Sequence, residues 1–389
     1  MINRFILSTL LVVSFFAKTE AANWDLKQIP APPGASRFGE SVTISRDGNT
    51  GLIAAPRENC TATISRCGAA YVYVRDGASW RLQARLAASD AAGGREFGGD
   101  EFDDHTIALS ADGHTALIGI NPINQGAVYV FVRNGESWSE QQKLVRPDPS
   151  VTGKNGFGRS VALSDDGKTA VIGDAGSAFS SSNVGPGSAY VLSRVGDHWA
   201  VQAHLTRSPS ASRLFGHAVD ISGDGGTVAV GSPTEAFVFK KRNGQWSEQA
   251  ILTAADKAVH YYDDRSLDQA LALSWSGETV LIDRYIFHRD SRLGVWREEA
   301  KLGANITDQS RFGFSVDMDS AGQNALVGDW GRGTVFLFHR DSDSTRGIVK
   351  WVPQRVLAKG GGVGSSVAIS GDANTILVGY GVYDLRRQP

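Results

Sequence analysis

The sequence predicts an all-β protein: a seven-bladed β-propeller of four-stranded antiparallel blades, closed by the N-terminal strand, which completes the last blade. Three observations predict this fold. The nineteen-residue phrase FGRSVALSDDGKTAVIGDA at 157–175 returns in looser form at 38–56, a Trp recurs in almost every unit, and the two ends of the chain are complementary parts of one unit. Units of this kind cannot bury their apolar faces alone, so we expect them to pack against one another in a ring.

The first 21 residues are typical of a secretory signal peptide. Arg4 supplies the positive start, 5–17 is mostly apolar, and TEA at 19–21 has the small-x-small cleavage pattern. The apolar stretch is shorter than the about 20 residues that span a bilayer. We therefore expect cleavage after Ala21. Residues 22–389 are expected to form a single propeller that is secreted, or periplasmic or held at the cell surface if the source is bacterial.

Each unit is predicted to contain four short strands joined by tight turns. In the unit at 157–205 the segments FGRSVALS, AVIGDA, GSAYVLSR and HWAVQAHL are apolar or alternating, and turn sequences such as DDGKT separate them. This pattern favours strands and hairpins over helices. Asp can hydrogen-bond within its own turn, and Gly accepts a positive φ. The units begin near residues 38, 97, 157, 215, 262, 312 and 363.

The fifth unit, near residue 262, has the weakest pattern. It lacks the Phe-Gly pair that opens most units, and its second and third strands are almost adjacent. The segments 271–274, 286–289 and 296–302 still fall in register with the other units, so we count it as a blade.

Tryptophan gives an independent count of the blades. Six Trp residues open candidate fourth strands, each with a Leu six positions later: Trp80, Trp138, Trp199, Trp246, Trp296 and Trp351. We interpret the recurrent Trp and Phe residues as core packing, because large aromatic side chains fill the wedge between neighbouring twisted sheets.

The ends of the chain complete the last blade together. The segment 24–29, beginning WDLKQI, resembles a fourth strand with no first three strands before it. The C-terminal segments GSSVAIS, ILVGY and GVYDLRR supply three strands and no fourth. Pairing the N-terminal strand with these three would close the ring without a gap.

Cys60 and Cys67 are the two cysteines of the chain. In an oxidising compartment a disulfide between them is expected, and it would make its short loop rigid more than it would stabilise the whole fold. A zinc site would need two further ligands, and no His lies close in sequence. The sequons at Asn59 and Asn305 are predicted glycosylation sites if the protein comes from a eukaryote.

The charge balance excludes some classes of partner. Lys+Arg 39 against Asp+Glu 41 gives a net charge of -2, which leaves no basic excess to neutralise phosphates, so we expect no nucleic acid partner. No cationic amphipathic segment that would lie on an anionic membrane follows the leader, and no membrane insertion is expected. The sequence also indicates no cofactor.

The Phe-Gly openings resemble the FG-GAP repeat, which builds the seven-bladed propeller of integrin alpha subunits and of many secreted proteins. The pair stands at Phe38-Gly39, Phe97-Gly98, Phe157-Gly158, Phe215-Gly216 and Phe312-Gly313, and is replaced by Val363-Gly364 in the last unit. The second half of the motif is AAP at 54–56, GDA at 173–175 and GSP at 231–233. The resemblance covers nearly the whole chain after the leader. It implies a fold and leaves the function open.

One departure from the family concerns calcium. Some family members carry a D-x-D-x-D-G loop between the first two strands of a blade, whose carboxylates coordinate Ca²⁺. Here the corresponding turns, such as SRDGNT and SDDGKT, hold at most two Asp, too few for the roughly six oxygens that Ca²⁺ requires. We therefore predict no integrin-type calcium site. The Ser-x-Asp-Gly phrase of these turns also resembles the sialidase Asp-box, but the spacing and the aromatic residue of that motif are absent here.

The connections between second and third strands, and between blades, are longer and more varied than the other turns. They are predicted to share one face of the disc, and variable loops on a rigid scaffold are the usual place for binding. On this face, the acidic run GDEFDDH at 99–105 is either a candidate cation site or an ordinary solvated loop. The segment YYDDRS at 261–266 is either a candidate contact for a sugar or protein or part of the ordinary packing. The candidate binding residues on this face are Arg57, Glu58, Asp103, Asp104, Tyr261, Tyr262, Trp330 and Arg332.

No catalytic motif accompanies these residues. The sequence contains neither Gly-x-Ser-x-Gly nor His-Glu-x-x-His. The glycine-rich segment 358–366 precedes a predicted strand, whereas a phosphate-binding loop precedes a helix. We therefore predict a monomeric, non-catalytic binding or adhesion module that engages a protein partner through the face with the long loops. The alternatives are a carbohydrate-binding lectin and, second, a secreted hydrolase with a site assembled from several blades.

Overall fold

The computed structural model describes thirteen parts of the chain: residues 24–94, 96–99, 106–120, 126–148, 156–175, 187–207, 214–232, 235–255, 270–304, 306, 311–343, 348–358 and 361–387. The predicted signal peptide, 1–21, lies outside them. No helix in these parts has the length and apolarity needed to cross a bilayer.

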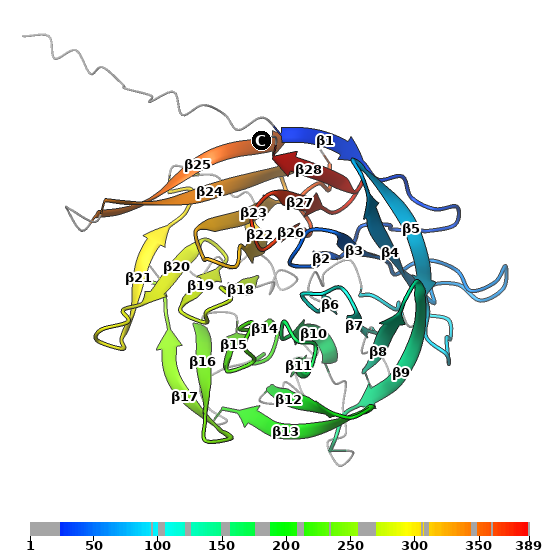
Figure 1. Ribbon diagram of the computed structural model, residues 1–389, viewed down its shortest axis with the longest axis horizontal. Coiled ribbons are helices and arrows are strands. Elements are labelled where there is room, and N and C mark those ends of the chain that lie inside the picture. The colour runs from blue at the N-terminus through cyan, green and yellow to red at the C-terminus, as the bar shows by residue number, and fades with distance from the viewer. Residues whose placement is uncertain are drawn as a thin grey trace, which may run out of the picture.

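The described residues form seven antiparallel sheets of four strands each, arranged as blades around a central axis (Figure 1). Blade one consists of β2 (Val42–Ile44), β3 (Thr50–Ala55), β4 (Ala69–Asp76) and β5 (Ser79–Leu86). Blade two consists of β6 (Ile107–Leu109), β7 (Thr115–Gly119), β8 (Ala127–Asn134) and β9 (Ser137–Val145). Blade three consists of β10 (Phe157–Leu163), β11 (Thr169–Asp174), β12 (Ser188–Val195) and β13 (His198–Thr206). Blades four and five are β14 (Val219–Ile221), β15 (Thr227–Ser232), β16 (Glu235–Arg242) and β17 (Gln245–Leu252); β18 (Leu271–Leu273), β19 (Thr279–Ile282), β20 (Tyr285–Arg289) and β21 (Trp296–Lys301). Blades six and seven are β22 (Phe312–Met318), β23 (Asn324–Asp329), β24 (Thr334–Asp343) and β25 (Ile348–Ala358); β26 (Val367–Ile369), β27 (Thr375–Val378), β28 (Tyr383–Arg387) and β1 (Trp24–Gln28).

The predicted closure of the ring is confirmed. β1 pairs antiparallel with β28, with Trp24 opposite Arg387 and Gln28 opposite Tyr383. The strand order of this sheet is β1-β28-β27-β26, so the N-terminal strand is the outer strand of the last blade (Figure 1). The all-β, seven-bladed fold predicted from the repeats is therefore the fold of the protein.

Packing explains why both residues of the Phe-Gly pair recur. The Phe ring packs edge-on against an aromatic ring of the third strand of its own blade, as in Phe97 and Tyr129, whose centroids are 5.5 Å apart. The Gly lies against the backbone of the preceding blade. At Gly216 φ is +92°, and an added Cβ would lie 2.1 Å from the carbonyl oxygen of Ser188 in blade three. A larger residue would therefore separate the blades.

The Ser-x-Asp-Gly turns between first and second strands are closed from within. In the turn of blade one the Ser45 hydroxyl donates to Asp47 Oδ1 at 2.6 Å and accepts from the Thr50 amide at 2.9 Å. Burial acts to raise the pKa of Asp47, but hydrogen bonds from Ser45 and Asn49 hold it below its usual value. These carboxylates thus stabilise their own turns.

The same turns link the blades to one another around the axis. The backbone amide of the x residue donates to the carbonyl of the x residue of a neighbouring blade, as from Arg46 to Ala111, from Ala111 to Asp165 and from Asp165 to Gly223. The corresponding bonds from Gly223 to Trp275, from Ser320 to Gly371 and from Gly371 to Arg46 extend this chain of bonds around the ring.

The core is divided into seven clusters of apolar side chains, each lying between two neighbouring blades. One Trp belongs to each cluster or packs against it. The indole of Trp138, for example, packs against the cluster between blades one and two and donates to Gln83 Oε1 of β5 at 3.0 Å. The structure therefore gives the recurrent Trp the packing role expected from the sequence.

Candidate functional site

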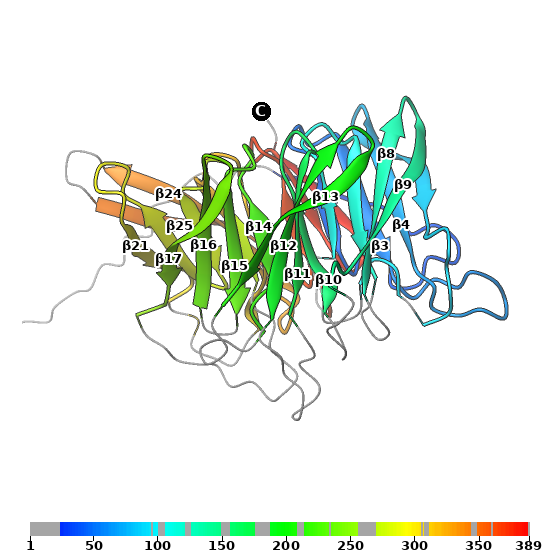
Figure 2. The same cartoon turned by 90° about the horizontal axis from the view of Figure 1, so that it is seen from below.

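The two faces of the disc differ in construction (Figure 2). The short-turn face carries the tight turns that join first to second and third to fourth strands. The long-loop face carries the connections between second and third strands and between blades; its described segments include 56–68, 87–94, 96–99 and 330–333. Because successive strands are antiparallel, these two sets of connections emerge on opposite faces.

On the short-turn face, three side chains from different blades meet at the axis. Arg46 of blade one pairs with Asp165 of blade three, and the indole nitrogen of Trp275 in blade five donates to the same Asp165 Oδ2 at 2.7 Å. The Arg46 guanidinium lies 4.8 Å from the centroid of the Trp275 ring. This cluster, which we call the hub clasp, ties three non-adjacent blades together.

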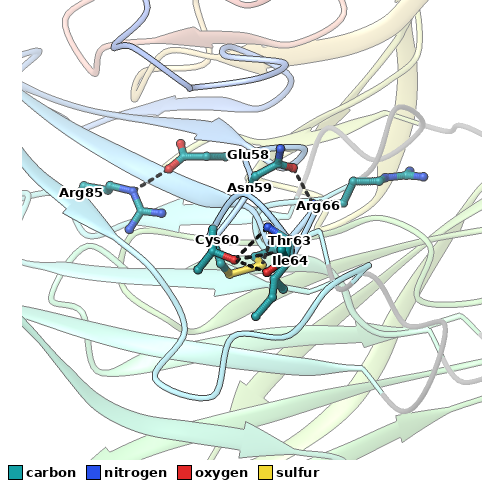
Figure 3. Close-up of a disulfide and its surroundings, with 9 residues drawn as sticks. Glu58, Asn59, Cys60, Thr63, Ile64, Arg66 and Arg85 are labelled. Carbon is teal, nitrogen blue, oxygen red and sulfur yellow. Dashed lines mark hydrogen bonds and ion pairs between the residues drawn. A yellow bond between two sulfur atoms is a disulfide. The ribbon is translucent and has the colours of Figure 1, made fainter.

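The connection from β3 to β4 on the long-loop face is held by the disulfide between Cys60 and Cys67, whose Cα atoms are 5.7 Å apart (Figure 3). The predicted pairing of the two cysteines is thus formed in the structure. Asn59 is exposed, and its Oδ1 accepts from the Arg66 amide at 3.1 Å across the base of the loop.

Glu58 anchors this loop from below. Its side chain is buried, Oε1 accepts from Arg85 Nε at 2.7 Å, and Oε2 accepts from the Tyr71 hydroxyl (Figure 3 draws the Arg85 bond). Burial and the neighbouring Glu58 carboxylate raise the pKa of Tyr71 to about 12. The carboxylate is thus used within the protein, and the predicted binding residue Glu58 supports the loop from beneath its surface.

Arg57 lies next to a second buried carboxylate. Glu96, which is 2% exposed, pairs with Arg66, and its Oε1 is 3.9 Å from Arg57 Nε. Both arginines thereby join the disulfide loop to the segment that precedes blade two. The side chain of Arg57 keeps 27% of its exposure, so it remains on the surface of the long-loop face.

Trp330 and Arg332 lie together in the turn from β23 to β24 of blade six. The Arg332 amide donates to Asp329 Oδ1 at 3.2 Å, and its guanidinium Nη1 is 3.9 Å from Asp329 Oδ2. The Trp330 ring packs 5.6 Å from the ring of Phe314, and the guanidinium of Arg311 lies 4.3 Å from the Trp330 centroid. Trp330 is partly exposed and the Arg332 side chain is 39% exposed.

A buried ion pair lies on the same face in blade three. Asp174, at the end of β11, is paired with Arg146 at 2.7 Å and is almost completely buried. Burial raises the pKa of Asp174 to about 6, and the Arg146 charge opposes this shift. The carboxylate is closed to solvent, and its ion pair joins the end of blade two to blade three.

Residues 138–192, from β9 of blade two to β12 of blade three, match the FG-GAP repeat. The chain contains an FG-GAP repeat. The matched segment includes Phe157 and Gly158, and most of the other blades carry the same phrase in the same structural positions. The protein is thus a seven-bladed β-propeller that contains an FG-GAP repeat.

No curated protein sequence matches this chain. Several solved structures share its fold at low sequence identity. Kuenenia stuttgartiensis hydrazine synthase has a TM-score of 0.57 at 14% identity, with 91% of this chain and 96% of that chain covered. The β-propeller domain of Myceliophteria thermophila Cps50 (Swd1) has a TM-score of 0.57 at 10% identity, covering 93% and 99%. Pseudomonas aeruginosa periplasmic gluconolactonase, PpgL, has a TM-score of 0.53 at 17% identity, covering 83% and 85%. These proteins differ widely in name, and the similarity shows the fold alone.

Several predicted site residues lie outside the described residues: Asp103, Asp104, Tyr261, Tyr262 and the sequon residue Asn305. Of the rest, the structure places Arg57 near Glu58 in blade one, and Trp330 near Arg332 in blade six. Within the described parts of the chain, no group of three or more His, Cys, Asp or Glu side chains is arranged to hold a metal ion.

Sequence reasoning missed Arg311 and Phe314, which complete the surroundings of Trp330. A signal was present in the sequence. Phe314 directly follows a Phe-Gly pair, at a position where the other blades with this pair have Glu40, Gly99, Arg159 or His217. An apolar aromatic residue at this position occurs in blade six and in none of these other blades, and this departure from the repeat marks blade six.

Proposed function

We propose that this propeller is a secreted or cell-surface binding module that engages a protein partner through its long-loop face. The observation that supports the proposal is the contrast between the two faces. The short-turn face consists of similar turns whose carboxylates accept hydrogen bonds within their own turns. At the axis, the hub clasp connects three blades on this face. The long-loop face carries unequal connections held in place by a disulfide and by ion pairs with buried carboxylates, such as that of Arg85 with Glu58. Braced, variable loops on a rigid scaffold are suited to specific binding.

The proposed role is non-catalytic. The described groups with the most strongly raised pKa values are Tyr71, Asp174 and Asp317, and each is engaged within the scaffold. Strongly shifted groups in an active site would be expected beside a cleft and a second reactive group. The proposal also includes a monomer without a nucleic acid partner or membrane insertion, in keeping with the net charge of -2.

The proposal can be tested by comparing variants of the two faces. Partners are captured by crosslinking from an extracellular protein mixture with residues 22–389 as bait, and each captured protein is then purified and measured for binding. Arg57→Ala and the double variant Trp330→Ala/Arg332→Ala change the long-loop face, whereas Lys168→Ala changes an exposed side chain of a short turn. We expect the long-loop variants to weaken binding by about tenfold or more, because interface arginines and tryptophans often contribute over 1 kcal/mol each.

The control variant Lys168→Ala is expected to bind like the parent chain. Thermal unfolding of every variant separates a loss of contacts from a loss of fold. If Lys168→Ala abolished binding while the long-loop variants bound normally, the assignment of the face would be wrong.

A further inference from the structure

Blade six carries a cluster of side chains on the long-loop face that the fold does not require. This cluster, the blade-six platform, consists of Arg311, Phe314 and Trp330. The Arg311 carbonyl accepts from the Phe314 amide at 3.2 Å, and the rings of Phe314 and Trp330 are 5.6 Å apart with an angle of 33° between their planes. All three side chains are partly exposed.

The repeat shows that these aromatic residues are not needed to build a blade. The positions that correspond to Phe314 hold Glu40, Gly99, Arg159, His217 and Ser365. Those that correspond to Trp330 hold Pro56, Ala175 and Gly381. Blades built with such residues pair their strands as blade six does. A local departure from an otherwise consistent pattern, without a structural need, points to function.

The charge of the platform indicates what it binds. The Arg311 guanidinium lies 4.3 Å from the Trp330 centroid and 5.9 Å from that of Phe314, and Arg311 forms no ion pair with a described carboxylate. Stacking on a ring uses the flat face of the guanidinium and leaves its N–H edge for an acceptor in the same plane. A carboxylate fits this edge with two parallel hydrogen bonds.

The neighbourhood of the platform is also rich in arginine. Arg332 lies in the same turn as Trp330, and Arg284 of blade five stacks on Phe312 with its guanidinium 4.8 Å from the ring centroid. Among the described residues, Asp329 ends β23, and Asp283 directly follows β19. Counting the buried Arg284, three guanidiniums therefore accompany two carboxylates among the described residues of this corner, and this positive balance favours an anionic ligand.

We propose that the blade-six platform is the energetic centre of the binding face, and that it takes an Asp or Glu side chain of a protein partner together with an adjacent apolar side chain. This inference rests on the proposed function and adds the chemistry of the partner. The carboxylate pairs with the N–H edge of Arg311, and the apolar side chain packs on Phe314 and Trp330. Tryptophan and arginine are the residue types that most often dominate protein–protein interfaces.

The test selects peptides and then removes the two halves of the contact in turn. A phage-displayed random peptide library is panned on residues 22–389 after depletion on the Arg311→Gln variant. Selected peptides are synthesised with their acidic residue intact and with Asp→Asn or Glu→Gln. Their affinities are measured for the parent, Arg311→Gln, Arg311→Lys and Trp330→Phe. Arg297→Gln, an exposed arginine on β21, is the matched control.

We expect the selected peptides to share an acidic residue beside an apolar one. Neutralising that residue is expected to weaken binding to the parent about tenfold, but less than about twofold for Arg311→Gln, because the partner of the carboxylate is then already absent. Arg311→Lys is expected to be intermediate, since it keeps the charge and loses the planar fork. Arg297→Gln is expected to behave as the parent.

Three outcomes would overturn the inference: no enriched peptide, enriched peptides without an acidic residue, or equal losses on the parent and Arg311→Gln. Binding of an oligogalacturonate that depends on Arg311, without peptide binding, would also overturn it and would assign the platform to acidic glycans. Should a captured partner respond to Arg57→Ala and not to Arg311→Gln, the binding face would stand and only the platform would be wrong.

Discussion

The side chain of Asp317 connects two neighbouring blades. It lies on β22, the innermost strand of blade six, where Oδ1 accepts from the Met318 amide at 2.7 Å and Oδ2 accepts from the Ile369 amide of β26 at 2.8 Å. Asp220 on β14 repeats this arrangement toward Leu273 of β18 at 2.7 Å. Each carboxylate therefore connects the innermost strands of two neighbouring blades.

The environment of Asp317 makes stability depend on pH. Burial, reinforced by the nearby Asp220 and Asp319, raises the pKa of Asp317 from 3.8 to about 7, although its two backbone bonds act in the opposite direction. The folded protein therefore keeps this proton at pH values where the unfolded chain has lost it. The stability from this group is fully present below about pH 4 and is lost as the pH rises through 7.

We expect Asp317→Asn to flatten this dependence. The amide cannot ionise, so the melting temperature of the variant should fall less between pH 5 and pH 8 than that of the parent. Its absolute stability at pH 5 is expected to be lower by about 1 kcal/mol, because the amide nitrogen cannot accept one of the two backbone bonds. The measurement is a series of thermal unfolding curves, with the exposed Asp25→Asn of β1 as the control. Parallel pH profiles for parent and Asp317→Asn would contradict this account.

Residue roles could be predicted where the repeat constrains them. The Gly of the Phe-Gly pair recurs because the preceding blade leaves no room for a Cβ, and the recurrence is visible in the sequence. Glu58 shows the limit. It lies in a loop unlike that of any other unit, and its partners Tyr71 and Arg85 come from two later strands, so sequence alone could not show that its side chain is buried.

The disulfide loop between β3 and β4 is anchored at several points. The disulfide, the Asn59 bond to the Arg66 amide, and the pair between Arg66 and Glu96 hold the two sides of the loop. The ends of the loop are thus anchored independently of the sulfur atoms. The disulfide therefore contributes to the order of the loop tip more than to the stability of the propeller.

The double variant Cys60→Ser/Cys67→Ser tests this division. We expect the free energy of unfolding to fall by about 2 kcal/mol, because the closed loop is short. Trypsin cleavage after Arg66 in the native protein is expected to become faster, since the exposed loop loses its covalent constraint. Ala62→Ser, which adds a hydroxyl to an exposed position of the same loop and keeps the disulfide, is the control. Unfolding of the whole propeller in the double variant would show that the disulfide is a general stabiliser.

Elements of the blades were predictable and the connections were not. Strand pairs recur with the same apolar pattern in each unit, so each copy supports the reading of the others, and even the weak fifth unit forms β18 to β21. The hub clasp has no such support. Its residues occupy the variable x position of three turns, and Arg46 and Asp165 are 119 positions apart in sequence. They meet because the ring closes.

Closure of the whole molecule depends on the seam between blades one and seven. β1 pairs along its full length with β28, and Trp24 and Leu26 pack against the cluster between blades six and seven. A buried ion pair crosses from blade one: Arg75 of β4 donates to both oxygens of Asp384 in β28 at 3.2 Å. The ring is therefore held at the seam by pairing within the last blade and by an ion pair between blades.

Two altered chains separate the pairing of β1 from its place in the sequence. Removing residues 24–28 exposes the edge of β28 and the apolar side chains beneath β1, and we expect a loss of at least about 3 kcal/mol in the free energy of unfolding.

In a circular permutant, a short hairpin linker joins Arg387 to Trp24, which already lie opposite each other, and new ends are placed at Gly196 in the β12–β13 turn. An added Cβ at Gly196 would meet nothing within 4 Å, so new ends there should be tolerated. We expect the permutant to melt within a few degrees of residues 24–387, as followed by circular dichroism. A truncated chain as stable as the parent would show that β1 does not close the ring, whereas an unfolded permutant would show that closure requires a free N-terminal strand.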